Sequence, residues 1–236
     1  MRLRQLDESQ FVTINRKLNP AIWAGDQLKP EVAAKLKEIA VAWEDFLGIP
    51  LDAIDLTVTG SNANYTWTAS SDLDLHIIVK GEPTDEQREL YSAKKDLWAE
   101  MHDITVKGLP VEVYVQGSKE THHSTGVYSI ARSKWLVEPK KVKPKVNDAA
   151  VQAKLSELQH VINLALVSTD LMIVNAAKKR VTQMRKAGLE RAGEWSIENL
   201  VFKQLRNQGL IDSISRHIRD LEDQDLSLEN QDNSLD

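Results

Sequence analysis

The sequence predicts an α+β fold in which a mixed sheet flanked by helices is followed by a C-terminal helical domain. Before about residue 145, short stretches alternate apolar and polar residues, as half-buried strands do, with helical stretches between them. After it, apolar residues recur every three or four positions, as in amphipathic helices. We therefore expect a sheet-containing domain over 1–145, a helical domain over 146–225 and a disordered tail over 226–236.

The breaker residues delimit the elements of the first domain. Residues 1–30 contain two prolines and are expected to be irregular, whereas Pro30 suits the first turn of a helix that ends at Gly48. Glycines also bound the strands. The elements expected after that helix are strands over 56–59, 73–79 and 111–115, a polar helix over 84–103, and a strand pair or a strand with a loop over 126–136.

The second domain begins after a segment rich in proline and lysine, 139–147, whose composition is that of an extended linker. Helical periodicity then runs from Val151 to about Met184. Gly188 and Gly193 are expected to interrupt it before a last helical pair over 196–221.

Composition excludes several classes of protein. The chain has 236 residues, 42% of them hydrophobic, which is enough for a substantial core. It has no cysteine, which excludes disulfides, thiolate metal sites and a cysteine nucleophile. No run of 18 apolar residues suits a membrane-spanning helix, and the first residues lack the apolar stretch of a secretory signal. We therefore expect a cytoplasmic protein without membrane contact.

The net charge of −5 is unevenly distributed. Residues 1–125 carry −7, residues 126–192 carry +8 and residues 193–236 carry −6. The basic middle segment, in particular 140–145 and 178–191, suits either a polyanion such as RNA or merely solvated helix faces.

The motif richest in chemistry lies between the first two strands. Asp72 and Asp74 are one residue apart at the head of an apolar strand, so both carboxylates project from one face. Such a pair needs a cation between its members, and Mg²⁺ or Mn²⁺ together with phosphate oxygens would supply one. The preceding turn, Gly60-Ser61, offers backbone amides and a hydroxyl to a phosphate.

A third carboxylate comes from the third strand. The valines of 111–115 take one face and leave Glu112 and Tyr114 on the other. If the second and third strands are neighbours, Glu112 stands beside the two aspartates, and three carboxylates suit two metal ions.

The arrangement of Gly60, Ser61, Asp72, Asp74 and Glu112 resembles the polymerase-β-like nucleotidyltransferase superfamily over about residues 30–140. Further segments, such as Tyr128–Arg132 and Glu198–Lys203, resemble uncharacterised nucleotidyltransferase-like proteins of tailed phages, for which the location would be the host cytoplasm. The chain departs from the superfamily pattern at Tyr65, where small members often have glycine.

The resemblance implies transfer of a nucleoside monophosphate from an NTP, with ATP expected, to an acceptor hydroxyl. Asp72, Asp74 and Glu112 would be catalytic and would hold Mg²⁺ or Mn²⁺. The residues expected to contact the nucleotide are Gly60, Ser61, Ser71, Trp67 and Arg132. An RNA 3′ end is the leading acceptor. A protein side chain, a small molecule, or no acceptor at all, as in an inactive nucleotide-binding or scaffold module, remain open.

Other residues allow two interpretations each. His76 shares the face of the aspartates and either touches a phosphate or hydrogen-bonds a neighbouring side chain. Trp67 stacks on a nucleobase or joins the core, and Arg132 neutralises phosphate or is a solvated edge charge. The pair His122-His123 has no third ligand at zinc spacing.

Overall fold

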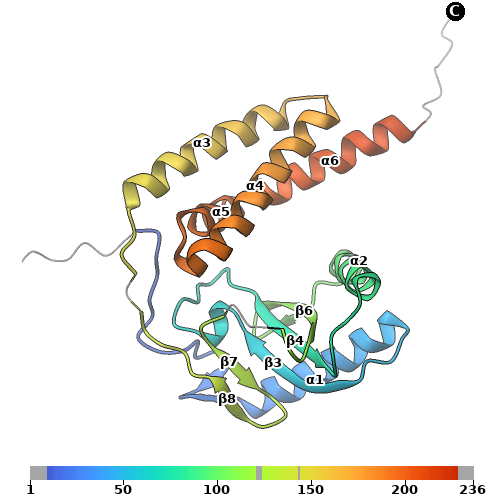
Figure 1. The fold of residues 1–236 in the computed structure, drawn as a ribbon, viewed down its shortest axis with the longest axis vertical. Coiled ribbons are helices and arrows are strands. Elements are labelled where there is room, and N and C mark those ends of the chain that lie inside the picture. Colours follow the sequence, from blue (N-terminus) through green and yellow to red (C-terminus); the bar gives the residue numbers. More distant parts are fainter. Residues whose placement is uncertain (1–9, 121–123, 143, 228–236) are drawn as a thin grey trace, which may run out of the picture. The chain divides into compact units, whose positions relative to one another are not determined.

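The computed structural model describes residues 10–120, 124–142 and 144–227. These residues form two compact units, one of residues 13–142 and one of residues 10–12 with 144–227. The first unit contains the sheet and the second is helical, so the expected α+β class, with a mixed sheet flanked by helices and C-terminal helices, is confirmed (Figure 1). Residues 228–236, most of the expected disordered tail, lie outside the described residues.

The sheet has six strands in the order β5-β6-β4-β3-β7-β8. The neighbours β4 and β6 run parallel and the other pairs are antiparallel, which makes the sheet mixed. The strands are β3 (Ala53–Thr59), β4 (Leu73–Val79), β5 (Thr105–Val106), β6 (Leu109–Gly117), β7 (Val127–Ser129) and β8 (Lys134–Val137). The central position of β4 explains its apolar character, because a strand between two others has no solvent-exposed edge.

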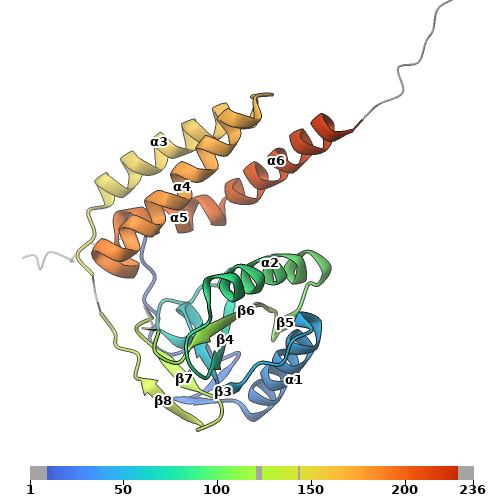
Figure 2. The same cartoon turned by 45° about the vertical axis from the view of Figure 1, so that its right-hand side comes forward.

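Two helices accompany this sheet, as Figure 2 shows. The first, α1 (Pro30–Leu47), has the expected proline in its first turn and ends at Gly48 in the left-handed conformation. The second, α2 (Asp85–Met101), begins with a capping box in which Thr84 and Gln87 satisfy each other's backbone N–H groups. The rings of Phe46 and Trp98 join the two helices at a centroid separation of 5.0 Å.

The core of the sheet unit combines α1, α2 and one face of β4. Trp43 of α1 and Leu73, Leu75 and Ile77 of β4 are almost completely buried in it. The opposite face of β4 therefore carries the polar residues of the strand.

The expectation of an irregular segment over residues 1–30 is wrong for its last part. Trp23–Ala24 (β1) and Gln27–Leu28 (β2) form a small antiparallel hairpin. The Trp23 ring stacks on Trp135 at 4.7 Å and packs edge-on against Tyr128 at 5.1 Å. Aromatic packing against distant strands orders this hairpin, and a local reading of the sequence does not include it.

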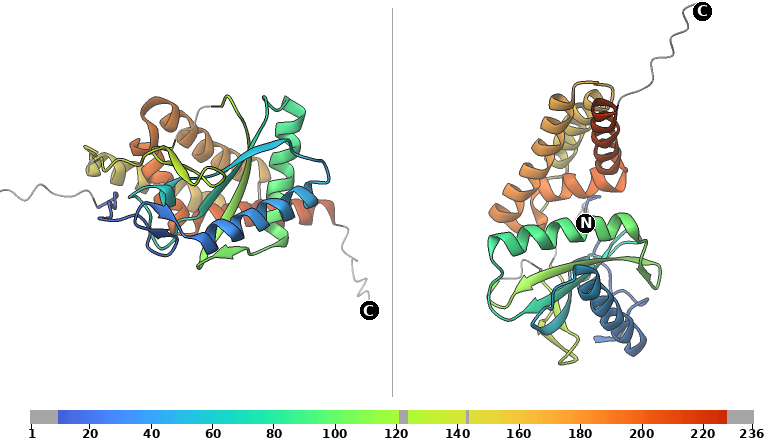
Figure 3. Two further views of the ribbon diagram at one scale, coloured as in Figure 1. Left: turned by 90° about the horizontal axis from the view of Figure 1, so that it is seen from below. Right: turned by 90° about the vertical axis from the view of Figure 1, so that its right-hand side faces the viewer.

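The helical unit contains α3 (Asp148–Leu166), α4 (Leu171–Ala192), α5 (Ile197–Asn207) and α6 (Leu210–Leu226). A single-turn helix, η2 (Gly193–Trp195), joins α4 to α5. Side chains of Asn147, Asp170 and Ser196 cap the N-termini of α3, α4 and α5. Figure 3 shows α3, α4 and α6 side by side. Buried apolar side chains of α3, α4, α5 and α6 form one core. None of the helices within the described ranges is long and apolar enough to cross a membrane.

Gly188 does not interrupt α4, contrary to expectation, but lies inside it. A Cβ at this position would lie 2.5 Å from the Cβ of Glu198 and 2.9 Å from Oγ of Ser196. The glycine is therefore explained by the close approach of the α5 N-terminus.

Candidate functional site

The polar face of β4 begins with the two aspartates. Asp74 and His76 are half-buried and alternate with the buried Leu73 and Leu75, as the sequence pattern predicts. Asp72 is also half-buried and lies directly before the first residue of β4. Asp74 thus projects away from the apolar core near the end of β4 where the strand begins, and Asp72 directly precedes this end.

The Gly-Ser loop, residues 60–64, lies against this end of the strand. Thr59, the last residue of β3, pairs with Asp74, and Gly60 follows it with φ 72° and ψ −159°. A Cβ at Gly60 would lie 1.8 Å from Oδ2 of Asp74. Only glycine allows both this backbone conformation and this contact, so the Asp74 carboxylate lies against Gly60, the residue that precedes Ser61.

Asn62 holds the Gly-Ser loop in place, a role that the sequence analysis missed. Its buried amide nitrogen donates to the carbonyls of Ser71 (3.2 Å) and Asp72 (2.8 Å), and its amide oxygen accepts from Asn19 (2.8 Å). Its own carbonyl accepts from the Trp23 indole at 2.6 Å. A fully buried asparagine at a turn could have indicated this, since buried amides need several partners.

Glu112 is brought next to the aspartates by strand pairing. In the parallel ladder between β4 and β6, Asp74 is the partner of Glu112 and His76 is the partner of Tyr114. The Glu112 carboxylate has two polar partners. Nζ of Lys95 lies 3.1 Å from Oε2, and the Tyr114 hydroxyl donates to the same oxygen.

Lys95 belongs to α2 and was not singled out from the sequence. Its ammonium lies 3.7 Å from the centroid of the Tyr114 ring, as well as beside Glu112. The signal was present in the helical spacing, because Tyr91, Lys94, Lys95 and Trp98 occupy one face of a helix. The two aromatic residues of that face are buried, and lysine stems on such a face extend along it toward polar groups.

His76 hydrogen-bonds a neighbouring side chain, one of the two alternatives considered. Its Nδ1 lies 2.7 Å from Oε1 of Gln116, and its ring lies against Tyr114 with centroids 4.8 Å apart. Both partners come from β6 and fix the orientation of the imidazole on the polar face.

Ser71 and Trp67 lie in the segment between the Gly-Ser loop and β4. The buried Ser71 hydroxyl accepts from the backbone N–H of Thr68 at 2.9 Å. The half-buried Trp67 indole donates to the carbonyl of Lys17 at 3.0 Å. In this structure both side chains stabilise the segment that joins the loop to Asp72.

Arg132 is not brought together with the aspartates. Its Nε lies 3.8 Å from Oδ2 of Asp55, a buried carboxylate that also accepts from the Ser129 hydroxyl at 2.7 Å. Asp55 pairs with Ile78, four residues beyond Asp74 on β4. At about 3.3 Å per residue, Arg132 therefore lies roughly 13 Å along the sheet from the acidic pair.

Tyr65, where the chain departs from the family pattern, is half-buried just after the Gly-Ser loop. Nζ of Lys141 lies 4.6 Å from the centroid of its ring. Asn15 donates to the Tyr65 carbonyl at 3.2 Å and to the Trp67 carbonyl at 2.7 Å. The Tyr65 ring therefore holds Lys141 of the linker near the loop. The two residues are far apart in sequence, so the sequence analysis did not predict this contact.

The basic segments are divided between the two units, because residues 140–142 belong to the sheet unit and Lys145 with 178–191 to the helical unit. Within α4, Arg180 pairs with Glu157 and Arg191 pairs with Glu198 at 2.7 Å. Lys178, Lys179 and Lys186 are exposed to solvent.

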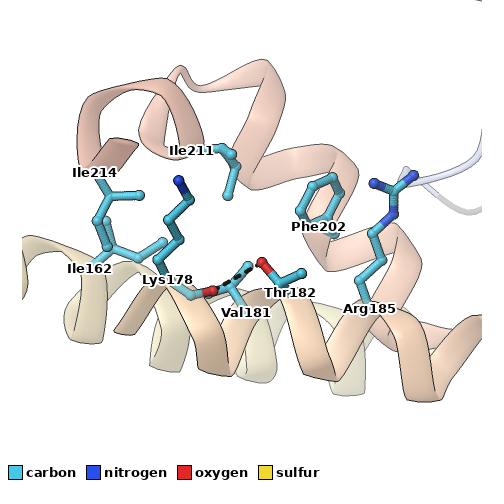
Figure 4. Close-up of a pocket in the computed structure, with 8 residues that line it drawn as sticks. All are labelled: Ile162, Lys178, Val181, Thr182, Arg185, Phe202, Ile211 and Ile214. Atoms are coloured by element: carbon cyan, nitrogen blue, oxygen red, sulfur yellow. Dashed lines mark hydrogen bonds between the residues drawn. The ribbon is translucent and has the colours of Figure 1, made fainter. Parts of the chain in front are cut away.

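One small pocket in the helical unit has a basic margin (Figure 4). Its volume is about 100 Å³, and its floor includes the buried Ile162, Val181 and Ile214. Lys178 and Arg185 line it, with the Arg185 guanidinium 4.2 Å from the centroid of the Phe202 ring.

The residues expected to hold a metal ion fit that role unequally. Asp72 and Asp74 are half-buried hard-oxygen donors beside a turn, which suits Mg²⁺ or Mn²⁺. Glu112 has a lysine ammonium against its carboxylate. Within the described ranges, no three Asp, Glu or His side chains form a group that could hold a metal ion. His122 and His123 lie outside these ranges.

Comparisons with known proteins give only distant similarities. No protein-family model and no curated protein matches this chain. The CdnE cyclic dinucleotide synthase of Elizabethkingia meningoseptica, solved with GTP and Apcpp, is 13% identical, with 81% of this chain and 77% of that chain covered and a TM-score of 0.27. The spectinomycin adenyltransferase AAD(9) of Enterococcus faecialis, solved with ATP and spectinomycin, is 11% identical, with 81% and 98% covered and a TM-score of 0.24.

A third solved structure, the CdnE c-UMP-AMP synthase of Rhodothermus marinus with Apcpp and Upnpp, is 13% identical. The alignment covers 86% of this chain and 95% of the synthase chain, with a TM-score of 0.22. The structures that the chain resembles are thus cyclic nucleotide synthases and an adenyltransferase. At these TM-scores, the similarities carry no conclusion about what this chain does.

Proposed function

We propose that this protein transfers a nucleoside monophosphate from an NTP, preferably ATP, to an acceptor hydroxyl with release of pyrophosphate. The observation that carries the proposal is the contact of the Asp74 carboxylate with Gly60, directly beside Ser61. This contact joins an acidic pair, suited to a divalent cation, with a turn suited to a phosphate. Transfer of a phosphoryl group depends mainly on such positioning and charge neutralisation.

Asp72 and Asp74 would hold the Mg²⁺ or Mn²⁺ ion, which would neutralise charge on the triphosphate when bound. Asn62 keeps the two parts of the site together by hydrogen-bonding the carbonyls of Ser71 and Asp72 from within the Gly-Ser loop. These hydrogen bonds join the Gly-Ser loop to the segment that leads into β4.

Ser61 would donate its hydroxyl to a β- or γ-phosphate, with the Gly60 backbone allowing close approach. Lys141 adds a cation near the same loop through its contact with the Tyr65 ring. Tyr65 is therefore compatible with an anionic ligand at this loop. Contacts of Trp67 with the base and of Ser71 with a phosphate stay predictions, and Arg132 lies too far along the sheet to join this group.

The acceptor that we propose is an RNA 3′ end. The support is the exposed lysines of α4, Lys178, Lys179 and Lys186, which have the chemistry of a phosphate-binding face. If each contacts one phosphate, replacing all three by alanine reduces the slope of log K against log salt by about 2, at about 0.7 per contact for single strands. NTP binding should be unchanged, since the Gly-Ser loop lies in the other unit.

The test of the activity is incubation with each α-³²P-labelled NTP, Mg²⁺, host RNA and host lysate. We expect labelled RNA with the wild type and none with Asp74→Asn. The matched control is Asp52→Asn, which changes an exposed carboxylate of the same unit that precedes β3, at the end of this strand away from the loop. Label on a polypeptide would replace RNA by a protein acceptor. NTP binding without any labelled product would contradict the enzyme activity and favour an inactive nucleotide-binding module.

A further inference from the structure

The third carboxylate of the site already has a resident cation. Nζ of Lys95 lies 3.1 Å from Oε2 of Glu112, and the Tyr114 hydroxyl donates to that same oxygen. The ammonium also lies 3.7 Å from the centroid of the Tyr114 ring. One lysine is therefore held by a carboxylate and by an aromatic face together, which localises it more firmly than a simple surface ion pair.

The pair is partly shielded from water. The side chain of Lys95 is 26% exposed and that of Glu112 is 37% exposed. Partial burial reduces solvent screening, so the positive charge of Lys95 acts strongly on any cation that approaches Glu112. A metal ion at Glu112 would have to displace the ammonium or bind beside a like charge.

Asp74 has a different environment although it pairs with Glu112 in the ladder between β4 and β6. Its carboxylate lies against Gly60 of the Gly-Ser loop. Asp74 thus contacts the Gly-Ser loop, and Glu112 contacts Lys95 and Tyr114.

We propose that Lys95 takes the place of a second metal ion, so that the site binds one divalent cation through Asp72 and Asp74. This inference rests on the proposed function, and it replaces the two metal ions that the sequence pattern suggested by one. Lys95 is a positioning residue: it holds Glu112 in a cation-paired state and prevents that carboxylate from acting as a metal ligand. Removing the ammonium should therefore create a second metal position, because the positive charge that pairs with Glu112 beside Asp74 would be lost.

The test counts Mn²⁺ ions bound per chain by equilibrium dialysis with a non-hydrolysable ATP analogue. We expect one ion for the wild type, two for Lys95→Met and one for the double variant Lys95→Met/Glu112→Gln. Lys94→Met is the matched control, because Lys94 is the preceding residue of α2 and its ammonium contacts the Phe46 ring and carbonyl instead of a carboxylate. It should bind one ion.

Several results would overturn the inference. Two ions in the wild type, reduced to one in Glu112→Gln, would show that Glu112 is a metal ligand and would leave the proposed function intact. A single ion in a folded Lys95→Met variant would also contradict it. No bound ion in the wild type would overturn the proposed function as well. If Lys95→Met does not fold, the comparison of the wild type with Glu112→Gln decides alone, since equal counts support the inference.

Discussion

The substitution Gly60→Ala tests the contact on which the candidate site depends. The added Cβ would lie 1.8 Å from Oδ2 of Asp74, whereas real Cβ contacts essentially never fall below 3.0 Å. The carboxylate oxygen must therefore move by at least about 1.2 Å, or the loop must move away from it. Either response changes the geometry between the phosphate-binding turn and the acidic pair.

Two effects of different size follow. The backbone of Gly60, with φ 72° and ψ −159°, lies in a region that only glycine adopts readily, so alanine should cost about 1–3 kcal/mol of unfolding free energy. Displacement of the carboxylate by about 1 Å should reduce turnover by about 100-fold, because reacting groups tolerate little misplacement. Mn²⁺ affinity should fall by about tenfold or more, since cation coordination is sensitive to ligand distance.

The assay combines urea denaturation with calorimetric titration of Mn²⁺ in the presence of a non-hydrolysable ATP analogue. Gly81→Ala is the matched control: Gly81 also has a positive φ, of 81°, but a Cβ there would meet nothing within 4 Å. We expect both variants to lose stability and only Gly60→Ala to lose Mn²⁺ affinity. Wild-type Mn²⁺ affinity in Gly60→Ala would refute the reasoning that this contact organises the site.

Three other substitutions test the packing and the electrostatics. Asn62→Ala removes three hydrogen bonds of a buried amide, at about 1 kcal/mol each, and should lower the free energy of unfolding by about 3 kcal/mol. Urea denaturation measures this change, and a decrease below about 1 kcal/mol would contradict the role of Asn62 in holding the loop. Gly188→Ala should destabilise the helical unit by about 1–3 kcal/mol, because the added Cβ would lie 2.5 Å from the Cβ of Glu198. If the close approach is unimportant, the higher helix propensity of alanine should instead stabilise the variant by about 1 kcal/mol. Burial raises the pKa of Glu198, but its backbone hydrogen bond and the Arg191 guanidinium outweigh burial and lower this pKa below 4.5. The stability that the ionised Glu198 contributes is therefore present above pH 4.5 and is lost as pH falls through the lowered pKa. Arg191→Gln should therefore reduce the loss of stability as pH falls below 4.5, measured by urea denaturation across this range, and an unchanged profile would contradict the coupling.

Much of the fold follows from local patterns that a sequence displays directly. The alternation at Leu73, Asp74, Leu75 and His76 predicted which side of β4 is buried, because side-chain direction in a strand depends only on position along the chain. The first helix was bounded correctly by Pro30 and Gly48, since both act through their own backbone geometry.

Local patterns failed where distant segments determine the structure. Gly188 looked like a helix interrupter, and the close approach of Glu198 explains it instead. Arg132 follows the strand of Glu112 in sequence, yet it lies in the turn between β7 and β8, which are on the other side of β3, and its guanidinium lies near Asp55. Nearness along the chain did not predict nearness in space.

For the candidate site, the sequence by itself determined the chemistry: which residues are acidic, that two aspartates stand at the start of a strand, and that Gly60-Ser61 follows the end of another. The tertiary structure decided what these groups meet. The strand order put Asp74 beside Glu112, the antiparallel register put its carboxylate against Gly60, and the packing of α2 brought Lys95 to Glu112. The physical reason is that residue type and period are properties of one segment, whereas the partner of a charge depends on how several segments pack together.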